Sequence, residues 1–251
     1  VPNSEGIDLF CGASHNEIVR NVISGNLSNG MRISSEWRGG EIDRSTAFNW
    51  ITGNRVGTDA SGANSLPNHH NGIQFDFRAE NNLVGGQSEA DSNIIRFNQN
   101  NGIAFILPHV RFNRITRNTI SSNESLGIAY EPNEDAVVVA PVITAVDRNY
   151  VRGTCVAPDG SVVEIFCGPD NEGEIYLGSA ALANGSFVFE GQIPRSRYVT
   201  ATVTDLDGNT SAFSLPVGNG VRIVSVEPNN NELAVAHNAT ISIAFDEPVS
   251  G

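Results

Sequence analysis

Hydrophobic residues in the first half of the chain occur in short groups, separated by glycine and asparagine at recurring intervals. The pattern Gly-apolar-x-apolar occurs five times, at Gly6, Gly30, Gly72, Gly102 and Gly127, with intervals of 24, 42, 30 and 25 residues. A base period in the low twenties with insertions is typical of a solenoid, in which each strand pairs with its counterpart one coil away at about 4.8 Å. The pattern therefore predicts three short parallel strands per coil.

Asn-x-apolar units follow the first four of these patterns and supply the remaining strands. The units begin at Asn16, Asn21, Asn49, Asn54, Asn82, Asn93, Asn113 and Asn118. Strand alternation predicts that Ile18, Ile51 and Ile115 face inward and that Glu17, Trp50 and Arg114 face outward. Asparagine tolerates the left-handed backbone that a sharp bend needs, and an inward amide can bond to its equivalent in the next coil. We therefore expect asparagines at the bends to form buried ladders.

Three longer motifs give residues 1–133 a resemblance to a known group. They read "NVISGN" at 21–26, "GNRVGTDAS" at 53–61 and "NNLVGG" at 81–86. These motifs resemble the right-handed parallel β-helix repeats of large secreted bacterial surface proteins. The resemblance covers about half of the chain and implies a β-helix and a secreted or cell-surface location. It implies no particular activity.

The composition changes after residue 133, where "AVVVAPVITAV" at 136–146 is rich in β-branched residues. Further strands are predicted at 150–156, 162–167, 175–177, 186–190, 198–204 and 211–215, with Asp-Gly or Asn-Gly turns at 159, 184 and 207. The spacing predicts a β-sandwich over 134–218. The segments "GTCVAPDGSVVEIF", "GEIYLGS" and "VTATVTDLDGNTSAFS" resemble the small Ig-like module that often follows such repeats.

Residues 219–251 resemble the opening of a second bacterial Ig-like domain, through "NATISIAFDEPV" at 238–249. This segment is too short to bury a core alone. We therefore expect it to continue in the intact protein or to be completed by another chain, with 241–245 as an open strand edge. Because the first coil strand begins at Gly6, we likewise expect further coils upstream or a stacked neighbour.

Composition and charge narrow the classes of partner. The 251 residues carry a formal charge of −13 and include no lysine, so binding to a nucleic acid backbone is not expected. No run approaches the ~18 apolar residues of a membrane span. Cys155 and Cys167 fall in one predicted antiparallel segment and are either bridged or buried thiols, whereas Cys11 stands apart. We expect no zinc site, because the cysteines and histidines show no ligand spacing.

The inserted loops hold the candidate ligand-binding residues. The loop at 34–48 carries Trp37, Arg38, Glu41, Asp43 and Arg44, a set that can stack on and hydrogen-bond to a sugar. The alternative is a salt-bridged solvated loop. The loop at 57–70 carries Asp59, His69 and His70. Adjacent histidines in a strand point to opposite faces, so we expect a turn there and no shared metal.

A third candidate is the run Asp205-x-Asp207-Gly-Asn209, which resembles the start of a calcium loop. An EF-hand also needs a glutamate at its twelfth position, which is Pro216 here. The run therefore predicts either a hairpin turn or a weak Ca²⁺ site, and we expect no other cofactor.

The outward positions of the five glycine patterns are Asp8, Arg32, Gln74, Ala104 and Ala129, which include no acid cluster for sugar cleavage. We assign no catalytic residue. The leading hypothesis is a structural or interaction segment of a secreted or surface-displayed bacterial protein, acting in adhesion or self-association into fibres. The alternative is a β-helix protein that binds or cleaves a polysaccharide, as a glycoside hydrolase or lyase.

Overall fold

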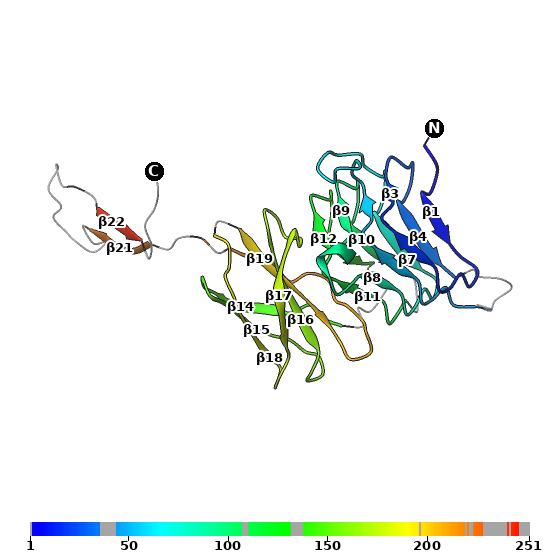
Figure 1. Cartoon of the computed structure of the whole chain (residues 1–251). Helices are drawn as coiled ribbons and strands as arrows, with labels where there is room; N and C mark the ends of the chain where they lie inside the picture. Colours follow the sequence, from blue (N-terminus) through cyan, green and yellow to red (C-terminus); the bar gives the residue numbers. More distant parts are fainter. Residues whose placement is uncertain are drawn as a thin grey trace.

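The computed structural model describes residues 2–35, 44–106, 110–131, 138–195, 197–218, 220, 223–227, 240 and 242–245 (Figure 1). Among these residues the fold is nearly all β, with parallel and antiparallel sheets and one short 3₁₀ turn at Glu89–Asp91. No helix in the described part of the chain is long and apolar enough to cross a membrane. The all-β class predicted from the sequence is confirmed.

The first part of the chain forms three parallel sheets. The first sheet contains β1 (Ile7–Leu9), β4 (Met31–Ser34), β7 (Ile73–Asp76), β10 (Ile103–Ile106) and β13 (Ile128–Tyr130) in that order. The second contains β2 (Glu17–Val19), β5 (Trp50–Thr52), β8 (Leu83–Gly85) and β11 (Arg114–Thr116). The third contains β3 (Val22–Ile23), β6 (Arg55–Val56), β9 (Ile94–Arg96) and β12 (Thr119–Ser121).

The chain visits these sheets in turn, and we call one passage through all three a circuit. Each strand pairs with the strand at the same place in the next circuit, as Ile18 does with Ile51 and Val84 with Ile115. The five Gly-apolar-x-apolar patterns form the first sheet, as the sequence predicts. A Cβ atom at Gly72 would lie 2.6 Å from the carbonyl oxygen of Gly102, so the close approach of successive circuits requires glycine there.

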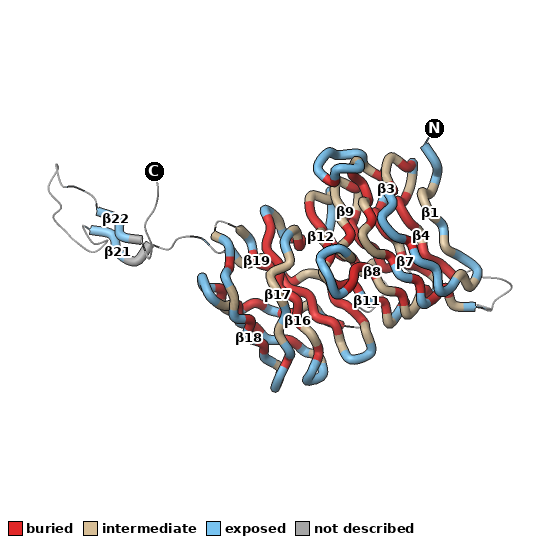
Figure 2. Tube along the Cα trace, viewed as in Figure 1, coloured by how far each residue is buried: buried red, intermediate tan, exposed pale blue. Residues whose placement is uncertain are grey.

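The interior between the parallel sheets is filled by aliphatic and aromatic side chains. Ile18, Ile51 and Ile115 are buried, whereas Glu17, Trp50 and Arg114 are exposed, so the predicted facing of these strands is confirmed. Figure 2 shows this alternation as red and pale segments along the strands. Three aromatic rings stack in register along the first sheet, with centroids 5.1 Å apart for Phe75 and Phe105 and 4.6 Å for Phe105 and Tyr130.

Buried asparagine ladders connect successive circuits, as predicted. The ladders are Asn16–Asn49–Asn82–Asn113, Asn21–Asn54–Asn93–Asn118 and Asn26–Asn68–Asn98–Asn123. In each pair the earlier side-chain amide donates to the Oδ1 atom of the later asparagine, at 2.7–3.1 Å. A fourth ladder, Asn29–Asn71–Asn101, runs in the opposite sense, because Asn101 donates to the Oδ1 atom of Asn71.

The predicted backbone conformation of these asparagines is wrong. The left-handed residue at most bends is the one immediately before the ladder asparagine, such as Arg20, Phe48 and Phe112, whose φ angles are 55°, 59° and 57°. The ladder asparagines are absent from the left-handed set among the described residues. The asparagine is thus selected for its two-sided hydrogen bonding, and the preceding residue bears the strain of the bend.

Two antiparallel sheets follow. One contains β14 (Val142–Val146), β15 (Tyr150–Thr154) and β18 (Ser186–Glu190), and the other contains β17 (Ile175–Ala181), β16 (Val162–Gly168), β19 (Tyr198–Thr204) and β20 (Val217–Gly218). Both contribute to a separate hydrophobic core that includes Val163, Ile165 and Phe187. Cys155 and Cys167 are buried and form no disulfide, which leaves the thiol interpretation.

The predicted strand at 211–215 is wrong. This segment follows β19, but the hydroxyl groups of Ser211 and Ser214 accept hydrogen bonds from the amides of Val203 and Ala201, each at 3.0 Å. The serine hydroxyls therefore accept hydrogen bonds that backbone carbonyl oxygens accept in a regular β-ladder.

The last described elements are β21 (Ile223–Glu227) and β22 (Ser242–Phe245), which pair antiparallel. Most of the predicted segment 219–251 lies outside the described residues, as does the predicted boundary at 133–134. The division into three domains stays a prediction.

Residues of the antiparallel part cover the last circuit. Glu172, which is 1% exposed, accepts hydrogen bonds at 3.3 Å from the backbone amide and the Nδ2 atom of Asn123. The Glu172 carboxylate thus takes the place of the next asparagine in the third ladder. Glu5 has the same role at the first circuit, where its carboxylate accepts from the backbone amide of Asn29 at 3.0 Å and from its side chain at 3.4 Å. In each of these two ladders, the terminal asparagine therefore donates its hydrogen bonds to a glutamate carboxylate.

Other residues of the last circuit also contact the antiparallel part. The amide of Phe112 donates to Asn209 at 2.6 Å, and the amide of Ile115 donates to the hydroxyl of Thr210 at 3.0 Å. Glu164 of β16 accepts from Thr116 at 2.6 Å and from the amide of Arg117 at 3.1 Å. Backbone donors of the last circuit, which would otherwise remain unpaired, are therefore satisfied by the second part of the chain.

Candidate functional site

The predicted sugar-binding loop is only partly covered by the structure. Trp37, Arg38, Glu41 and Asp43 lie outside the described residues, whereas Arg44 is described and exposed. The Arg44 side chain runs beside Gly12. The prediction for the rest of this set is therefore untested.

The second predicted loop is ordered by its own aspartate. Asp59 accepts hydrogen bonds from the Ser61 hydroxyl at 2.6 Å and from the Asn64 side chain at 2.8 Å. These hydrogen bonds hold the pKa of Asp59 well below its usual range. His69 and His70 form a bend, and His70 lies 3.0 Å from the Oδ1 atom of Asn29.

The calcium candidates Asp205, Asp207 and Asn209 form a tight turn. The Asp205 carboxylate accepts from the Asp207 amide at 3.0 Å and from the backbone and side chain of Asn209, both at 2.8 Å. The Oδ1 atom of Asn209 faces Phe112. Among the described residues, no group of three or more His, Cys, Asp or Glu side chains is placed to hold a metal ion. The turn explains these contacts, and the calcium site stays a prediction.

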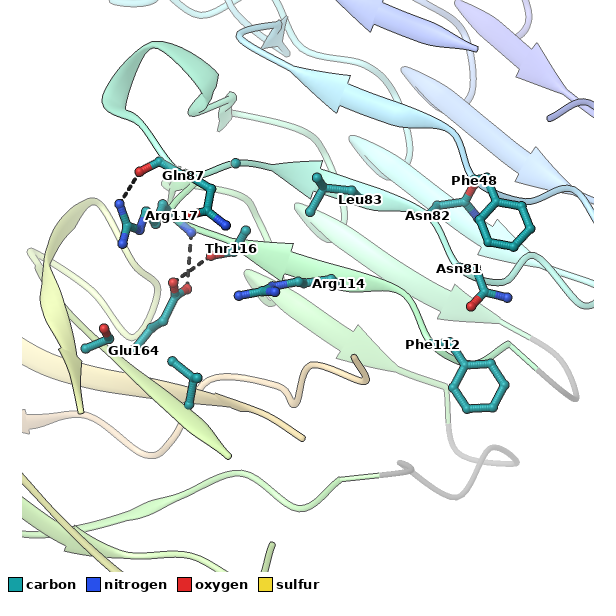
Figure 3. Close-up of a pocket in the computed structure, with 13 residues that line it drawn as sticks. Phe48, Asn81, Asn82, Leu83, Gln87, Phe112, Arg114, Thr116, Arg117 and Glu164 are labelled. Carbon is teal, nitrogen blue, oxygen red and sulfur yellow. Dashed lines mark hydrogen bonds between the residues drawn. The ribbon is translucent and has the colours of Figure 1, made fainter. Parts of the chain in front are cut away.

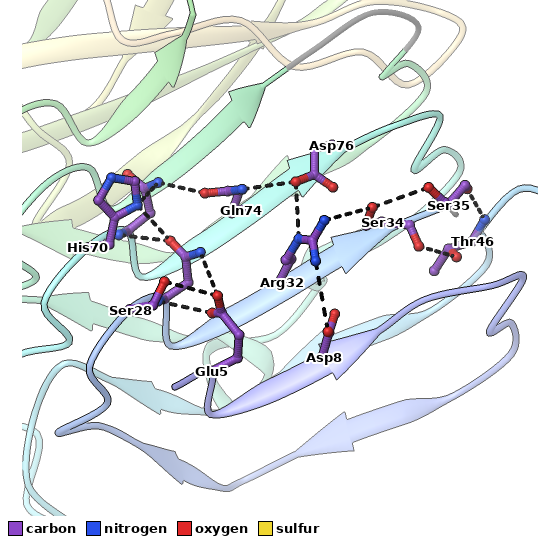
Figure 4. A network of polar contacts seen from close by, with 12 residues as sticks. Glu5, Asp8, Ser28, Arg32, Ser34, Ser35, Thr46, His70, Gln74 and Asp76 are labelled. Atoms are coloured by element: carbon purple, nitrogen blue, oxygen red, sulfur yellow. Dashed lines mark hydrogen bonds and ion pairs between the residues drawn. The ribbon is translucent and has the colours of Figure 1, made fainter. Parts of the chain in front are cut away.

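A polar network covers the outer side of β1, β4 and β7 (Figure 4). Arg32 lies between two carboxylates, 4.0 Å from Asp8 and 3.2 Å from Asp76, which is 3% exposed. Gln74 donates to Asp76 at 2.9 Å. Burial raises the pKa of Asp8, and the neighbouring Arg32 opposes this shift. The positions of Asp8, Arg32 and Gln74 were predicted, but Asp76, one residue beyond the apolar pattern, was missed.

This network is mainly structural in character. Its charged groups pair with one another across successive strands, and Arg32 fills the space between the two carboxylates. A ligand would have to displace the guanidinium to reach both acids.

The outer face of the second sheet carries two adjoining hollows. One has a volume of about 340 Å³ and is lined by His15, Asn16, Glu17, Phe48 and Trp50. The other, of about 320 Å³, begins at Phe48 and extends past Leu83 and Arg114 to Glu164 (Figure 3). The two hollows share Phe48 on their rims, and we call them together the Trp50 groove. It crosses β2, β5, β8 and β11 and ends against β16.

Part of the lining of this groove was predicted from the sequence. The outward positions of Glu17, Trp50 and Arg114 were predicted from alternation and line the groove as expected. Phe48 and Phe112 were missed, since both are left-handed bend residues and were not assigned to a face. Both residues come immediately before a ladder asparagine, and this position is the sequence signal that could have identified them.

Electrostatics differ between the two ends of the groove. Glu17 lies at one end, and Arg114 and Arg117 lie at the other. Arg117 donates to the carbonyl oxygen of Gln87, and its guanidinium lies 5.0 Å from the ring centroid of Tyr176. Burial raises the pKa of Glu164, and its hydrogen bonds to Thr116 and Arg117 oppose the shift. The β16 end of the groove therefore presents mainly positive charge.

The carboxylates of the groove do not have the spacing of a glycosidase pair. Glu17 lies on β2, three strands from β11, which corresponds to about 14 Å at the usual strand spacing. Glycosidases hold their two carboxyl groups roughly 5–9.5 Å apart. Glu164, beyond β11, is farther still and is held by Thr116 and Arg117. The described lining of the groove therefore holds no glycosidase carboxylate pair.

Comparisons with known proteins do not add a family. No protein-family model matches the chain, and a search of curated proteins finds no match.

Proposed function

We propose that this chain is a structural and interaction segment of a secreted or surface-displayed bacterial protein. In this proposal the three parallel sheets form a right-handed parallel β-helix, and the antiparallel sheets form an Ig-like β-sandwich that follows it. The cyclic strand order, the asparagine ladders and the motifs at 21–26, 53–61 and 81–86 support this interpretation. A rod of this kind suits the display of binding surfaces away from a cell.

The observation that carries the proposal is the polar junction between the two parts. Glu164, Glu172, Asn209 and Thr210 all accept hydrogen bonds from backbone amides of the last circuit. Because these bonds are spread from Phe112 to Asn123 of the last circuit, they oppose movement of the two parts relative to each other. A stiff connection is what a load-bearing or spacing element needs, whereas a flexible linker would permit independent movement.

The test is the behaviour of the purified protein at surfaces and at high concentration. Sedimentation velocity and electron microscopy will detect self-association, and protein-coated beads will detect adhesion to cells and immobilised glycans. We expect at least one of these interactions. A chain that stays monomeric and adheres to neither cells nor glycans contradicts the proposal.

The second candidate is cleavage of a polysaccharide, which the acidic residues Glu41 and Asp43 of the loop at 34–48 suggest. Acidic and neutral polysaccharides can be assayed for new reducing ends and for unsaturated products. Cleavage that is lost on Glu41→Ala or Asp43→Ala would replace the structural proposal by an enzymatic one. Binding through the groove without cleavage agrees with the proposal above.

A further inference from the structure

The Trp50 groove has an aromatic floor that is unusual for this chain, whose aromatic content is only 7%. Trp50 is 54% exposed and Phe48 is 50% exposed. Phe48 stacks on His15, which lines the same hollow, with ring centroids 5.3 Å apart and an angle of 27° between the planes. Large apolar rings are normally buried, and rings held exposed in a hollow mark a binding surface.

We propose that the Trp50 groove binds a linear polysaccharide that carries carboxylate groups, with its long axis along the stack of circuits. This inference rests on the proposed interaction role and names the class of ligand for it. The C–H faces of sugar rings pack against Trp50 and Phe48. A sugar carboxylate pairs with Arg114 at the β16 end.

The geometry of the parallel sheet matches an extended sugar chain. Successive strands bring equivalent side chains past the groove at intervals of about 4.8 Å, close to the length of one pyranose unit in an extended chain. Glu17, Trp50, Leu83 and Arg114 occupy equivalent positions on β2, β5, β8 and β11. Each sugar unit therefore meets a different side chain of the same column.

Charge complementarity at the β16 end of the groove favours an anionic sugar. The protein carries a formal charge of −13, yet Arg114 and Arg117 both lie at the β16 end of the groove. The one carboxylate beside them, Glu164, is engaged by Thr116 and by the amide of Arg117. Figure 3 shows Arg114 between the Phe112 side of the pocket and Glu164. Arg114 is exposed and can form a two-point contact with a carboxylate.

Amide side chains supply partners for hydroxyl groups. Asn81 and Gln87 line the same hollow as Arg114, on either side of Leu83. A neutral sugar chain would use these amides and the aromatic rings but not the arginine. An acidic peptide would use the arginine but gain less from the flat faces of Trp50 and Phe48. The two alternatives therefore give different results in a binding assay.

The experiment is isothermal titration of the whole chain with three probes of similar length: a hexamer of galacturonic acid, a neutral cellulose hexamer and a hexamer of glutamic acid. We expect the uronic acid hexamer to bind tightest. Trp50→Ala should weaken its binding about tenfold, and Arg114→Gln should lower its affinity to that of the neutral hexamer. Tyr198→Ala and Arg152→Gln, at exposed positions on β19 and β15, serve as matched controls and should change nothing.

Circular dichroism and the urea midpoint of each variant will establish that it is folded, which both surface substitutions should permit. Three results overturn the inference. They are no binding of the uronic acid hexamer by the folded wild-type chain, equal affinity for the uronic acid probe and either other hexamer, and binding that Trp50→Ala or Arg114→Gln leaves unchanged.

Discussion

Replacing Asn54 by alanine tests the asparagine ladders at an interior rung. Asn54 is fully buried, and its Oδ1 atom accepts from the backbone amide of Asn21 at 2.9 Å and from its side chain at 3.1 Å. Its Nδ2 atom donates to the carbonyl oxygen of Ile18 at 2.7 Å and to Asn93 at 3.0 Å. The Nδ2 atom also donates to the carbonyl oxygen of Thr52 at 3.2 Å, so the substitution removes five hydrogen bonds at once.

The expected loss of stability follows from these contacts. A net hydrogen bond contributes about 1 kcal/mol, and a buried group left without a partner costs roughly 1–3 kcal/mol. The carbonyl group of Ile18 loses the Asn54 amide in a buried position, whereas the Oδ1 atom of Asn93 keeps the backbone amide of Asn54. We therefore expect Asn54→Ala to lower the free energy of unfolding by about 3–5 kcal/mol.

Asn21→Ala is the matched control at the first rung of the same ladder. Asn21 is exposed, and its side chain donates to Asn54 and to the carbonyl oxygen of Val19. We expect it to cost about 1 kcal/mol. Urea unfolding followed by circular dichroism, with equal slopes for both variants, gives the comparison. The reasoning is refuted if Asn54→Ala costs no more than Asn21→Ala.

Three further predictions address the core, the bends and the junction. Phe105→Ala should lower the free energy of unfolding by about 3–5 kcal/mol, because Phe105 stacks between two rings; a loss below about 1 kcal/mol in urea unfolding would contradict the stack. Arg20→Gly should be neutral or stabilise by up to about 1 kcal/mol, since glycine relieves the left-handed strain, whereas Arg114→Gly in a strand should destabilise by a similar amount. Equal shifts in the thermal unfolding midpoint of the two variants would contradict the assignment of backbone strain to Arg20. Burial raises the pKa of Glu172 to about 8 from 4.5, so the stability it contributes is present below pH 4.5 and is lost as the pH rises towards 8, by at most about 1.4 kcal/mol per pH unit. Glu172→Gln should flatten this decline in the free energy of unfolding, measured by urea titrations between pH 5 and 8. If the dependence on pH is unchanged in this variant, Glu172 is not the buried carboxyl group that causes it.

The parallel part of the fold was predictable because its signals are local and repeated. Gly30 and Gly72 each begin an apolar alternation, and equivalent residues such as Ile18 and Ile51 must share a face if they pair in register. Repetition over several circuits makes an accidental pattern improbable. The ladders followed from the same register.

The bends were not predictable from residue preferences. Preference favours asparagine or glycine in the left-handed region, but Phe48 and Phe112 hold that conformation, while the asparagine that follows each of them pairs with Asn82 of the neighbouring circuit. The hydrogen-bonding demand of the ladder outweighs the strain at the preceding residue. The opposite sense of the Asn29 ladder also has no local signal, because it depends on which group faces the next circuit.

The junction and the groove depend on contacts between distant segments. Glu172 lies 49 residues from Asn123 in the sequence, and nothing near it marks it as the end of a ladder. Trp50 and Arg114 were predicted to face outward, but the groove also needs Glu164 of β16 and the bend residue Phe48. Strand alternation predicts which face of the sheet a side chain lies on. A hollow also depends on where a second element packs beside that face, and alternation does not predict this.

The most direct test of the buried ladders is hydrogen exchange of asparagine side-chain amides, measured by NMR on protein labelled with ¹⁵N at asparagine. The structure predicts slow exchange for interior rungs such as Asn54, Asn82 and Asn93, and fast exchange for the exposed Asn21. Fast exchange at all of these side chains, in a protein that is otherwise folded, would contradict the stacked circuits on which the proposed roles depend.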